Sequence, residues 1–274
     1  METTQHHREV ISATTFRVSG GRRLADDVNV AYILPSDKDE VKRLKLNHDL
    51  WSLYKSDMHD QLKKGIRVLD VGCGPGWWTL DMAALYPNSQ FIGIDMADVF
   101  VTKDLPSNVT FKQMNAGTGL DFEDASFDFV FQRFLVMGLS VDQYSSSVAE
   151  IKRVLKPEGA IEILELINDY SNPSPAFARI GLWSRSIFLS SVLENAGFHN
   201  IKDVNYDVPI GPWGGEPGEM FLAIQRLALP AVKVMVTELT NATTEEYDKT
   251  VKQAFEEANT HQVSTRFRLI YASK

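Results

Sequence analysis

Apolar residues between positions 66 and 166 follow two alternating patterns. Five short apolar runs have the length and composition of buried β-strands: 66 to 71, 90 to 95, 109 to 114, 127 to 132 and 159 to 166. Between them, the stretches near 77 to 86 and 141 to 155 carry apolar side chains at helical spacing, and 97 to 103 could form a shorter helix. Strands that alternate with helices predict a parallel sheet covered by helices on both faces.

The regions on either side of this alternation have different patterns. Residues 1 to 35 read as irregular or briefly extended, and a helix capped by Ser36 or Asp37 is expected to run to Gly65. Later elements are expected in this order: a helix at 175 to 196, a strand at 201 to 208, two or three helical stretches between 218 and 259, and a strand at 267 to 271. We therefore expect an N-terminal segment with a helix (1–64), and a core (65–274) with a helical insertion at about 216–260.

Composition limits the class of protein. The 274 residues are 44% hydrophobic, which is ample for the core of one α/β unit. A formal net charge of −8 argues against a protein that grips nucleic-acid phosphates with a basic face. No apolar run approaches the ~20 residues that cross a bilayer, and the polar start is unlike a signal peptide, so we expect no membrane partner and a cytoplasmic location. The single cysteine, Cys73, fits a reducing compartment, and no residues with metal-ligand spacing are present.

The most informative segment joins the first of these strands to the second. The first strand leads into a glycine turn at Gly72, Gly74 and Gly76, and the second strand ends on Asp95. Glycine lets the backbone turn sharply and approach a ligand closely. An acid at the tip of the next strand can accept hydrogen bonds from ribose hydroxyls. The segment therefore predicts a site for a cofactor that contains a nucleoside.

The spacing of the glycines indicates which cofactor. A dinucleotide site needs Gly-x-Gly-x-x-Gly, whereas here the third glycine comes one residue early and Trp77 fills the required position. Asp70 precedes the turn by two residues, where a carboxylate would repel a pyrophosphate but attract an ammonium group. These two residues disfavour an NAD-dependent oxidoreductase.

Five segments in order resemble the class I S-adenosylmethionine-dependent methyltransferases, and more narrowly their fungal LaeA-like and trans-aconitate-methyltransferase-like branch. They are Ala-Tyr-Ile-Leu-Pro-Ser-Asp (31–37), Val-Leu-Asp-Val-Gly-Cys-Gly-Pro-Gly (68–76), Tyr-Pro-Asn-Ser-Gln-Phe-Ile-Gly-Ile-Asp (86–95), Ser-Phe-Asp-Phe-Val-Phe-Gln-Arg (126–133) and Arg-Val-Leu-Lys-Pro-Glu-Gly (153–159). The resemblance implies a Rossmann-like fold with a seven-stranded, mostly parallel sheet, an N-terminal helical lid and a helical insertion near the C-terminus. It also implies S-adenosylmethionine as cofactor and S-adenosylhomocysteine as product. Where the family commonly has Pro-Gly-Gly, this chain has Pro-Glu-Gly, and we expect Gly159 to supply a positive φ.

The resemblance also implies roles for individual residues. The three turn glycines would lie under the methionine part of the cofactor, Asp70 would face its amino group, and Asp95 would accept from both ribose hydroxyls. Of the neighbours Trp77 and Trp78, one is expected in the core and the other, taken here as Trp78, beside the cofactor. The remaining cofactor residues would be Tyr32 in a lid, Met96, Asn115 and Ala116 around the adenine, and Gln132 near the methionine carboxylate and the sulfonium.

Candidates for acceptor chemistry each have a second interpretation. Glu165, at the end of the fifth strand, could orient an acceptor or cap a helix, and Arg133 could contact a ligand or form a surface salt bridge. His48 and His59 would share one face of the predicted first helix, although two solvated histidines are the simpler interpretation. Three tryptophans could line an apolar acceptor pocket or pack in the core: Trp51, Trp183 and Trp213.

In such an enzyme the methyl group moves by in-line displacement, so the protein mainly aligns the acceptor with an already activated cofactor. A hydroxyl acceptor would need a general base, whereas an amine or an ionised acid would not. We expect a methyltransferase for a small-molecule acceptor, with an oxygen of a secondary metabolite favoured over nitrogen or carbon, in a monomer or homodimer. The alternative is a LaeA-like regulator that binds the cofactor but acts through protein partners.

Overall fold

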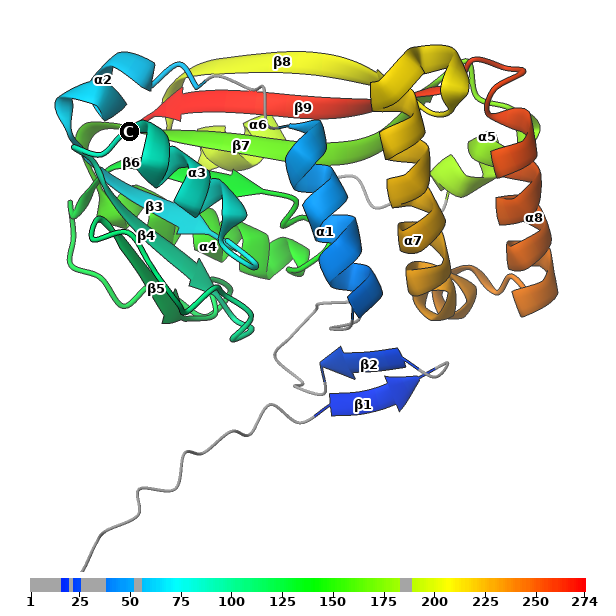
Figure 1. Cartoon of the computed structure of the whole chain (residues 1–274), viewed down its shortest axis with the longest axis horizontal. Coiled ribbons are helices and arrows are strands. Elements are labelled where there is room, and N and C mark those ends of the chain that lie inside the picture. Colours follow the sequence, from blue (N-terminus) through cyan, green and yellow to red (C-terminus); the bar gives the residue numbers. More distant parts are fainter. Residues whose placement is uncertain (1–15, 20–21, 26–37, 52–55, 183–188) are drawn as a thin grey trace, which may run out of the picture.

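A computed structural model describes residues 16–19, 22–25, 38–51, 56–182 and 189–274. Its central feature is a seven-stranded sheet in the order β5-β4-β3-β6-β7-β9-β8. The strands are β3 (Arg67–Val71), β4 (Gln90–Asp95), β5 (Val109–Gln113), β6 (Phe127–Arg133), β7 (Leu155–Ser171), β8 (His199–Pro209) and β9 (Ser264–Ser273). Strands β3 to β7 pair in parallel, and β9 runs antiparallel to both of its neighbours, β7 and β8. The predicted Rossmann-like sheet is therefore confirmed (Figure 1).

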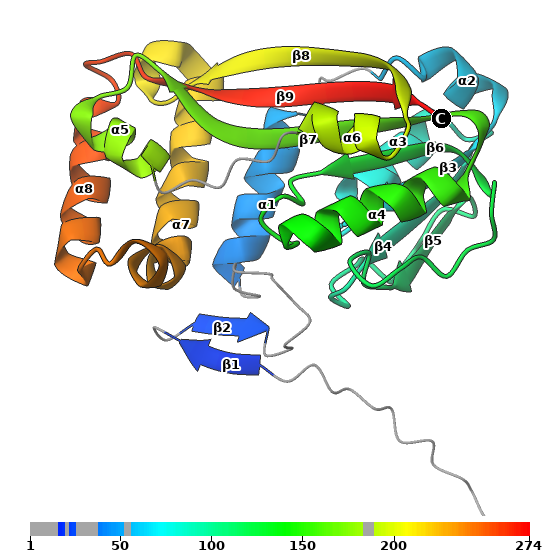
Figure 2. The same ribbon diagram turned by 180° about the vertical axis from the view of Figure 1, so that it is seen from behind.

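Helices cover both faces of the sheet. They are α1 (Lys38–Leu50), α2 (His59–Lys64), α3 (Trp77–Leu85), α4 (Val141–Val154), α5 (Pro175–Leu182), α6 (Leu189–Asn195), α7 (Gly215–Thr240) and α8 (Thr244–Glu257), with a short 3₁₀ turn, η1 (Pro212–Gly214). Helices α2 and α3 lie on the face seen in Figure 1, and α4 and α6 lie on the face seen in Figure 2. A separate two-stranded hairpin, β1 (Phe16–Ser19) with β2 (Arg22–Ala25), precedes α1.

Side chains from the two faces of the sheet form two layers of core. On one face Val68 packs with Trp78 of α3 and Leu62 of α2. On the opposite face the next residue of β3, Leu69, packs with Tyr144 of α4. Because consecutive strand residues point to opposite faces, a sheet covered on both sides needs apolar residues at every position, which explains the continuous apolar runs in the sequence.

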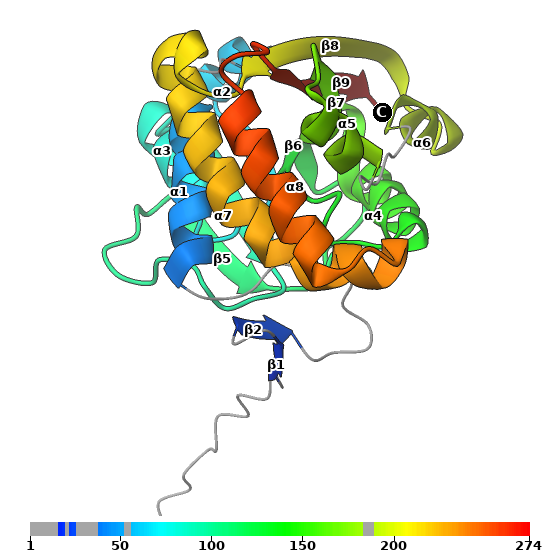
Figure 3. The same cartoon turned by 90° about the vertical axis from the view of Figure 1, so that its right-hand side faces the viewer.

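The long strands β7, β8 and β9 extend past the parallel part of the sheet and carry a third core. Helices α5, α7 and α8 pack there around Phe177, Phe221 and Phe267, each of which is buried. Figure 3 shows α1, α7 and α8 side by side, and α7 contacts both of the other two. Helices α7 and α8 account for the helical insertion that the resemblance implied.

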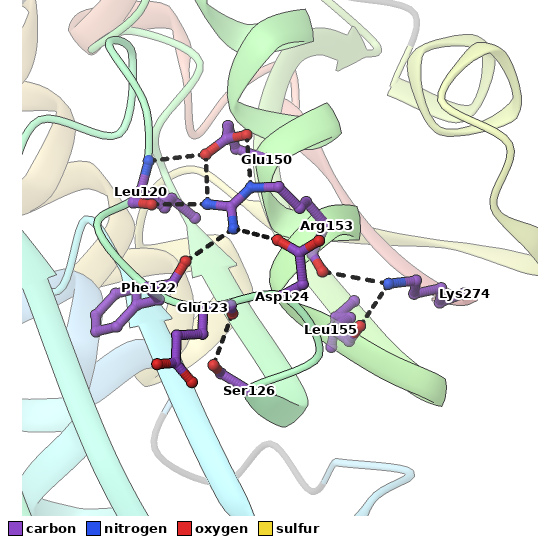
Figure 4. Close-up of polar contacts among 9 residues, drawn as sticks. All are labelled: Leu120, Phe122, Glu123, Asp124, Ser126, Glu150, Arg153, Leu155 and Lys274. Carbon is purple, nitrogen blue, oxygen red and sulfur yellow. Dashed lines mark hydrogen bonds and ion pairs between the residues drawn. The ribbon is translucent and has the colours of Figure 1, made fainter.

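Arg153 fixes the amino-terminal edge of the sheet (Figure 4). Its guanidinium donates to the carbonyl oxygens of Leu120 and Phe122 and to the carboxylates of Asp124 and Glu150, at 2.7 to 2.9 Å. These bonds tie the end of α4 to the loop that leads into β6. The edge lies opposite the carboxyl ends of the parallel strands, so we assign this network to the fold and not to a ligand site.

Several predicted elements were wrong in extent. The single helix expected up to Gly65 is two helices, α1 and α2, with a break that includes residues 51 and 56–58, and no helix forms at 97–103. Of the helix expected at 175–196, the structure describes α5 and α6, and residues 183–188 lie outside the described residues. The positive φ expected at Gly159 belongs instead to Glu158, at 65°. Gly159 is required for space, because a Cβ there would lie 2.8 Å from the Lys156 carbonyl oxygen.

One segment contradicts the expectation that no apolar run could reach membrane-spanning length. Among the described residues, Pro212–Glu238 is long and apolar enough to cross a bilayer by length and composition. Helix α7 lies within this fold against α1, α8 and β8, and 33% of its most apolar window is buried. Core helices of soluble proteins satisfy the same criterion, so this is weak evidence for a membrane span.

Candidate functional site

The glycine turn lies between β3 and α3, at the carboxyl edge of the sheet. Gly72, Gly74 and Gly76 have φ angles of 72°, 54° and 84°, in the left-handed region that favours glycine. A Cβ at Gly76 would lie 2.3 Å from the ring of Phe111, whereas among the described residues a Cβ at Gly74 would meet only Leu44, at 3.9 Å. The backbone around Gly74 is therefore approachable, as close contact with a ligand requires.

Asp95 lies beside this turn at the end of β4. Its carboxylate accepts one hydrogen bond from the backbone N–H of Gly74 and one from that of Ala97, each at 2.9 Å. Burial raises the pKa of Asp95, and the backbone donors partly offset this effect. Each carboxylate oxygen can accept more than one hydrogen bond, so Asp95 can still receive hydroxyl donors from a ligand.

Asp70 is the second acid of the site and is 2% exposed. It accepts a 2.6 Å hydrogen bond from the Thr79 hydroxyl on α3. Burial raises the pKa of Asp70 to about 6, against the opposing effects of Thr79 and of the Arg133 charge. Asp70 thus provides a buried, partly ionised carboxyl group where an ammonium group was predicted to bind.

Arg133 ends β6 and reaches α1. Its guanidinium donates to His48 Nδ1 at 3.1 Å, and His48 Nε2 lies 2.9 Å from an Asp81 carboxylate oxygen on α3. Arginine can only donate, so Nδ1 is the acceptor and Nε2 carries the proton that is donated to Asp81. Burial and the Arg133 charge lower the pKa of His48 against the opposing effect of Asp81, which favours the neutral ring. The surface salt bridge considered for Arg133 does not occur among the described residues, whose ion pairs do not include it.

Gln132, Tyr144 and Glu165 form a buried polar cluster next to Arg133. Gln132 donates to the Tyr144 hydroxyl at 2.8 Å, and Tyr144 is hydrogen-bonded to Glu165. One Glu165 oxygen also accepts from the backbone N–H groups of Leu135 and Val136, at 2.8 and 3.2 Å. Burial raises the pKa of Glu165 to about 8. Glu165 holds the loop after β6, and this loop places Leu135 against Gly72.

Residues predicted around the adenine follow β4 and β5. Met96 is half-buried, and its carbonyl oxygen accepts from the Gln113 side chain at 2.9 Å. The Asn115 side-chain oxygen, expected to accept from the adenine, already accepts from the Gly117 N–H at 2.9 Å. Ala116 is buried in the core on the α4 face of the sheet.

The structure corrects several predicted aromatic and histidine positions. Trp78 was predicted beside the cofactor but stacks on Phe131 in the core, with ring centroids 3.9 Å apart, whereas Trp77 is only half-buried. Trp213 is 36% exposed, and its indole N–H donates to the Ile210 carbonyl oxygen, so it does not wall a buried pocket. His59 does not share a helix face with His48, because it begins α2 and bonds to the Tyr86 hydroxyl.

Trp51 lies between α1 and the extended strands. Its ring packs on Phe267 and Tyr206 at centroid distances of 5.0 and 5.7 Å, and its buried indole nitrogen has no hydrogen-bond partner within the part of the chain that the structure describes. The predicted positions Tyr32 and Trp183 lie outside the described residues.

Sequence reasoning missed four residues that shape the site: Thr79, Asp81, Phe111 and Tyr144. The predicted α3 helix placed Thr79 and Asp81 near the turn, but nothing in the sequence indicated their partners. Phe111 and Tyr144 come from more distant segments. Within the described residues, no group of three or more His, Cys, Asp or Glu side chains could hold a metal ion.

Comparison with known proteins gives consistent results. Residues 68–159 match the family described as "Methyltransferase domain". The secondary metabolism regulator laeA of Coprinopsis cinerea is 29% identical over 158 residues, which cover 53% of this chain and 38% of that protein. The secondary metabolism regulator LAE1 of Cochliobolus heterostrophus is 26% identical over 220 residues, 68% of each chain. A demethylmenaquinone methyltransferase of Staphylococcus aureus is 35% identical over 125 residues, covering 43% of this chain and 50% of that one.

Among solved structures, the [4+2]-cyclase SpnF shares the fold alone. It aligns with 86% of this chain and 94% of its own at a TM-score of 0.50 and 19% identity. The sheet and the domain matched over residues 68–159 make this chain similar to the class I S-adenosylmethionine-dependent methyltransferases. Two of its relatives are named as secondary metabolism regulators, and the matched domain supports S-adenosylmethionine as the cofactor. The chain spans well under two thirds of the C. cinerea relative and half of the bacterial one.

Proposed function

We propose that this chain transfers a methyl group from S-adenosylmethionine to a small-molecule acceptor and releases S-adenosylhomocysteine. The observation that carries the proposal is the glycine turn with Asp95 bonded to its centre, at the carboxyl edge of a parallel sheet. The similarity to a demethylmenaquinone methyltransferase supports a small acceptor, since the name of that protein describes such a reaction.

The proposed cofactor contacts follow from charge and position. The turn glycines lie under the methionine chain, and Asp95 accepts from the ribose hydroxyls. Asp70 is a buried acid and Arg133 is a cation, and each favours the charged form of the other although they form no ion pair. The methionine end of the cofactor carries an ammonium and a carboxylate, so Asp70 and Arg133 match its two charges. Backbone groups near Met96, Asn115 and Ala116 would border the adenine.

The acceptor side is inferred from the state of the three candidate catalytic side chains, His48, Arg133 and Glu165. Both ring nitrogens of His48 are in hydrogen bonds, Arg133 is a cation, and Glu165 is buried in a cluster that holds a loop. A neutral alcohol would need a base to reach a useful rate. We therefore propose an oxygen acceptor that arrives ionised, such as a carboxylate or an acidic phenol or enol, and Trp51 is the candidate to contact it.

The second candidate function is a regulator that binds the cofactor and acts through protein partners. The observation that favours it is the similarity to two proteins named as secondary metabolism regulators. The fold does not discriminate between the two functions, since the structure of a cyclase shares it.

The experiment is calorimetric titration with S-adenosylhomocysteine, followed by mass spectrometry of acceptor mixtures for products heavier by one methylene group. The mixtures should separate carboxylic acids, phenols and amines, and Asp95→Ala serves as the matched control. Binding with a new oxygen-methylated product supports the enzyme. Binding with no product from any class, together with a stable protein complex, supports the regulator. Failure to bind would overturn both candidates.

A further inference from the structure

Three side chains from three different elements form one hydrogen-bonded chain at the edge of the site. Asp81 belongs to α3, His48 to α1, and Arg133 to the end of β6. The contacts are 2.9 Å between Asp81 and His48 and 3.1 Å between His48 and Arg133. His48 is 6% exposed, whereas the Asp81 side chain is 62% exposed. The chain therefore runs from the surface of α3, through a buried ring, to the guanidinium.

The direction of each hydrogen bond is determined by chemistry. A guanidinium has five N–H donors and no acceptor, so it requires the unprotonated Nδ1 of His48. The proton on Nε2 is then donated to Asp81, which fixes the tautomer and the ring plane. The ring also packs at 6.1 Å from Trp77, which begins α3. His48 thus has no free nitrogen with which to act on an acceptor.

The bond to His48 uses one of the five N–H donors of Arg133. Among the described residues, no carboxylate forms an ion pair with this guanidinium. Burial lowers the pKa of Arg133, which means that its charge is poorly solvated. Asp70, the acid that most favours this charge, directs a carboxylate oxygen to Thr79. A partly buried cation in this position favours an anionic ligand group.

We propose that His48 and Asp81 are positioning residues that hold the Arg133 guanidinium ready for the carboxylate of the cofactor. This inference rests on the proposed function. In this proposal His48 of α1 orients Arg133 at the end of β6. His48 is then no longer a candidate for the general base. Without His48, the arginine must be ordered at each binding event, and the cofactor loses affinity through its carboxylate alone.

The test uses two ligands that differ at the methionine end. S-adenosylhomocysteine carries the carboxylate and the ammonium, whereas 5′-methylthioadenosine has the same nucleoside and thioether but neither charged group. Calorimetry with the full chain measures both affinities for each variant. The informative quantity is the ratio of the two dissociation constants, because a general loss of structure at the site weakens both ligands.

His48→Phe keeps the ring and its packing while removing both nitrogens. We expect it to weaken S-adenosylhomocysteine about threefold to tenfold, the range for ordering one long side chain on binding, with no change for methylthioadenosine. Arg133→Met should weaken the same ligand about tenfold to a hundredfold. In an Arg133→Met background, His48→Phe should have no further effect, since the two residues act as one unit.

Asp81 offers a test that does not disturb the core, because its side chain is exposed. Asp81→Ala should shift the ratio in the same direction as His48→Phe, and Asp81→Asn should restore most of it. Lys42→Met, an exposed change on α1, is the matched control and should leave both affinities unchanged.

Each outcome decides a separate point. No binding of S-adenosylhomocysteine to the unaltered protein would overturn the proposed function. Binding that His48→Phe and Asp81→Ala leave intact, or weaken equally for both ligands, would overturn the positioning role and leave the methyltransferase proposal standing. Additive effects of His48→Phe and Arg133→Met would also contradict it.

Discussion

Glu165→Gln should make the stability of this protein less dependent on pH. Burial raises the pKa of Glu165 from an ordinary value of 4.5 to about 8, so the folded protein retains a proton that the unfolded chain releases at lower pH. A group of this kind contributes stability that is fully present below pH 4.5 and is lost as pH rises through about 8. The side chain is 1% exposed, so little of this effect is screened by solvent.

The size of the effect follows from the two pKa values. At about 1.36 kcal/mol per pKa unit, ionising Glu165 is on the order of 5 kcal/mol costlier in the folded protein than in the unfolded chain. Between pH 6 and pH 8.5 this corresponds to a loss of about 2.5 kcal/mol in the free energy of unfolding. Glutamine stays neutral throughout and can keep the bonds from Leu135 and Val136. Its amide can donate to Tyr144, whose hydroxyl can then donate to the Gln132 oxygen, which has no partner among the described residues.

The assay is urea unfolding of the original protein and of Glu165→Gln at pH 6 and at pH 8.5. The difference in unfolding free energy between the two proteins should move in favour of the glutamine variant by about 2.5 kcal/mol over this range. Taking the difference cancels the other titrating groups, Asp70 included. Glu194→Gln, on the exposed side of α6, controls for loss of a carboxylate. Parallel pH profiles for the original protein and Glu165→Gln would refute the reasoning.

Three further predictions concern the turns and the cofactor. Asp95→Ala should weaken S-adenosylhomocysteine binding by about 1.5 to 3 kcal/mol through loss of charged hydrogen bonds, and unchanged affinity in calorimetry would exclude the ribose role. Glu158→Gly should raise the free energy of unfolding by about 0.5 to 1 kcal/mol, because relief of the left-handed strain at φ 65° exceeds the entropy cost of glycine. Urea unfolding measures this change. An equal gain from Glu158→Ala, which retains the Cβ, would contradict the prediction. Gly76→Ala should destabilise the protein by about 1 to 3 kcal/mol through the 2.3 Å approach of its Cβ to Phe111. Thermal melting of the Gly76→Ala variant and of the double variant with Phe111→Leu measures this effect. If the double variant recovers no stability, the backbone angle is the sole cause.

The parallel strands could be predicted because each is an apolar run between turns, and burial on both faces leaves that pattern in the sequence itself. The N-terminal helix could not be bounded in the same way. Its apolar spacing continued past Leu50, but Trp51 turns away to pack on Phe267 of β9, and His59 starts a new helix. A contact with a strand more than two hundred positions later decided where that helix ends.

The two neighbouring tryptophans show the same limit at the site. The sequence predicted one in the core and one at the surface of the site, but both follow Gly76 directly and only the packing of α3 on the sheet distinguishes them. Trp78 stacks on Phe131 in the core and does not line the site, whereas Trp77 faces α1. Similarly, Glu165 was placed at a strand end, but only the loop it holds revealed that it is not free to meet an acceptor.

By itself, the sequence determined the order of the parallel elements, the left-handed glycine turn and the acids Asp70 and Asp95, because these depend on local backbone demands and on residues close along the chain. Only the tertiary structure decided that Arg133, His48 and Asp81 form one chain of hydrogen bonds. These residues are separated by at least 33 positions, and their bonds exist only because α1 packs beside α3 and the end of β6. Burial, which sets the pKa of Glu165 and the need of Arg133 for an anion, likewise arises only when distant segments exclude water together.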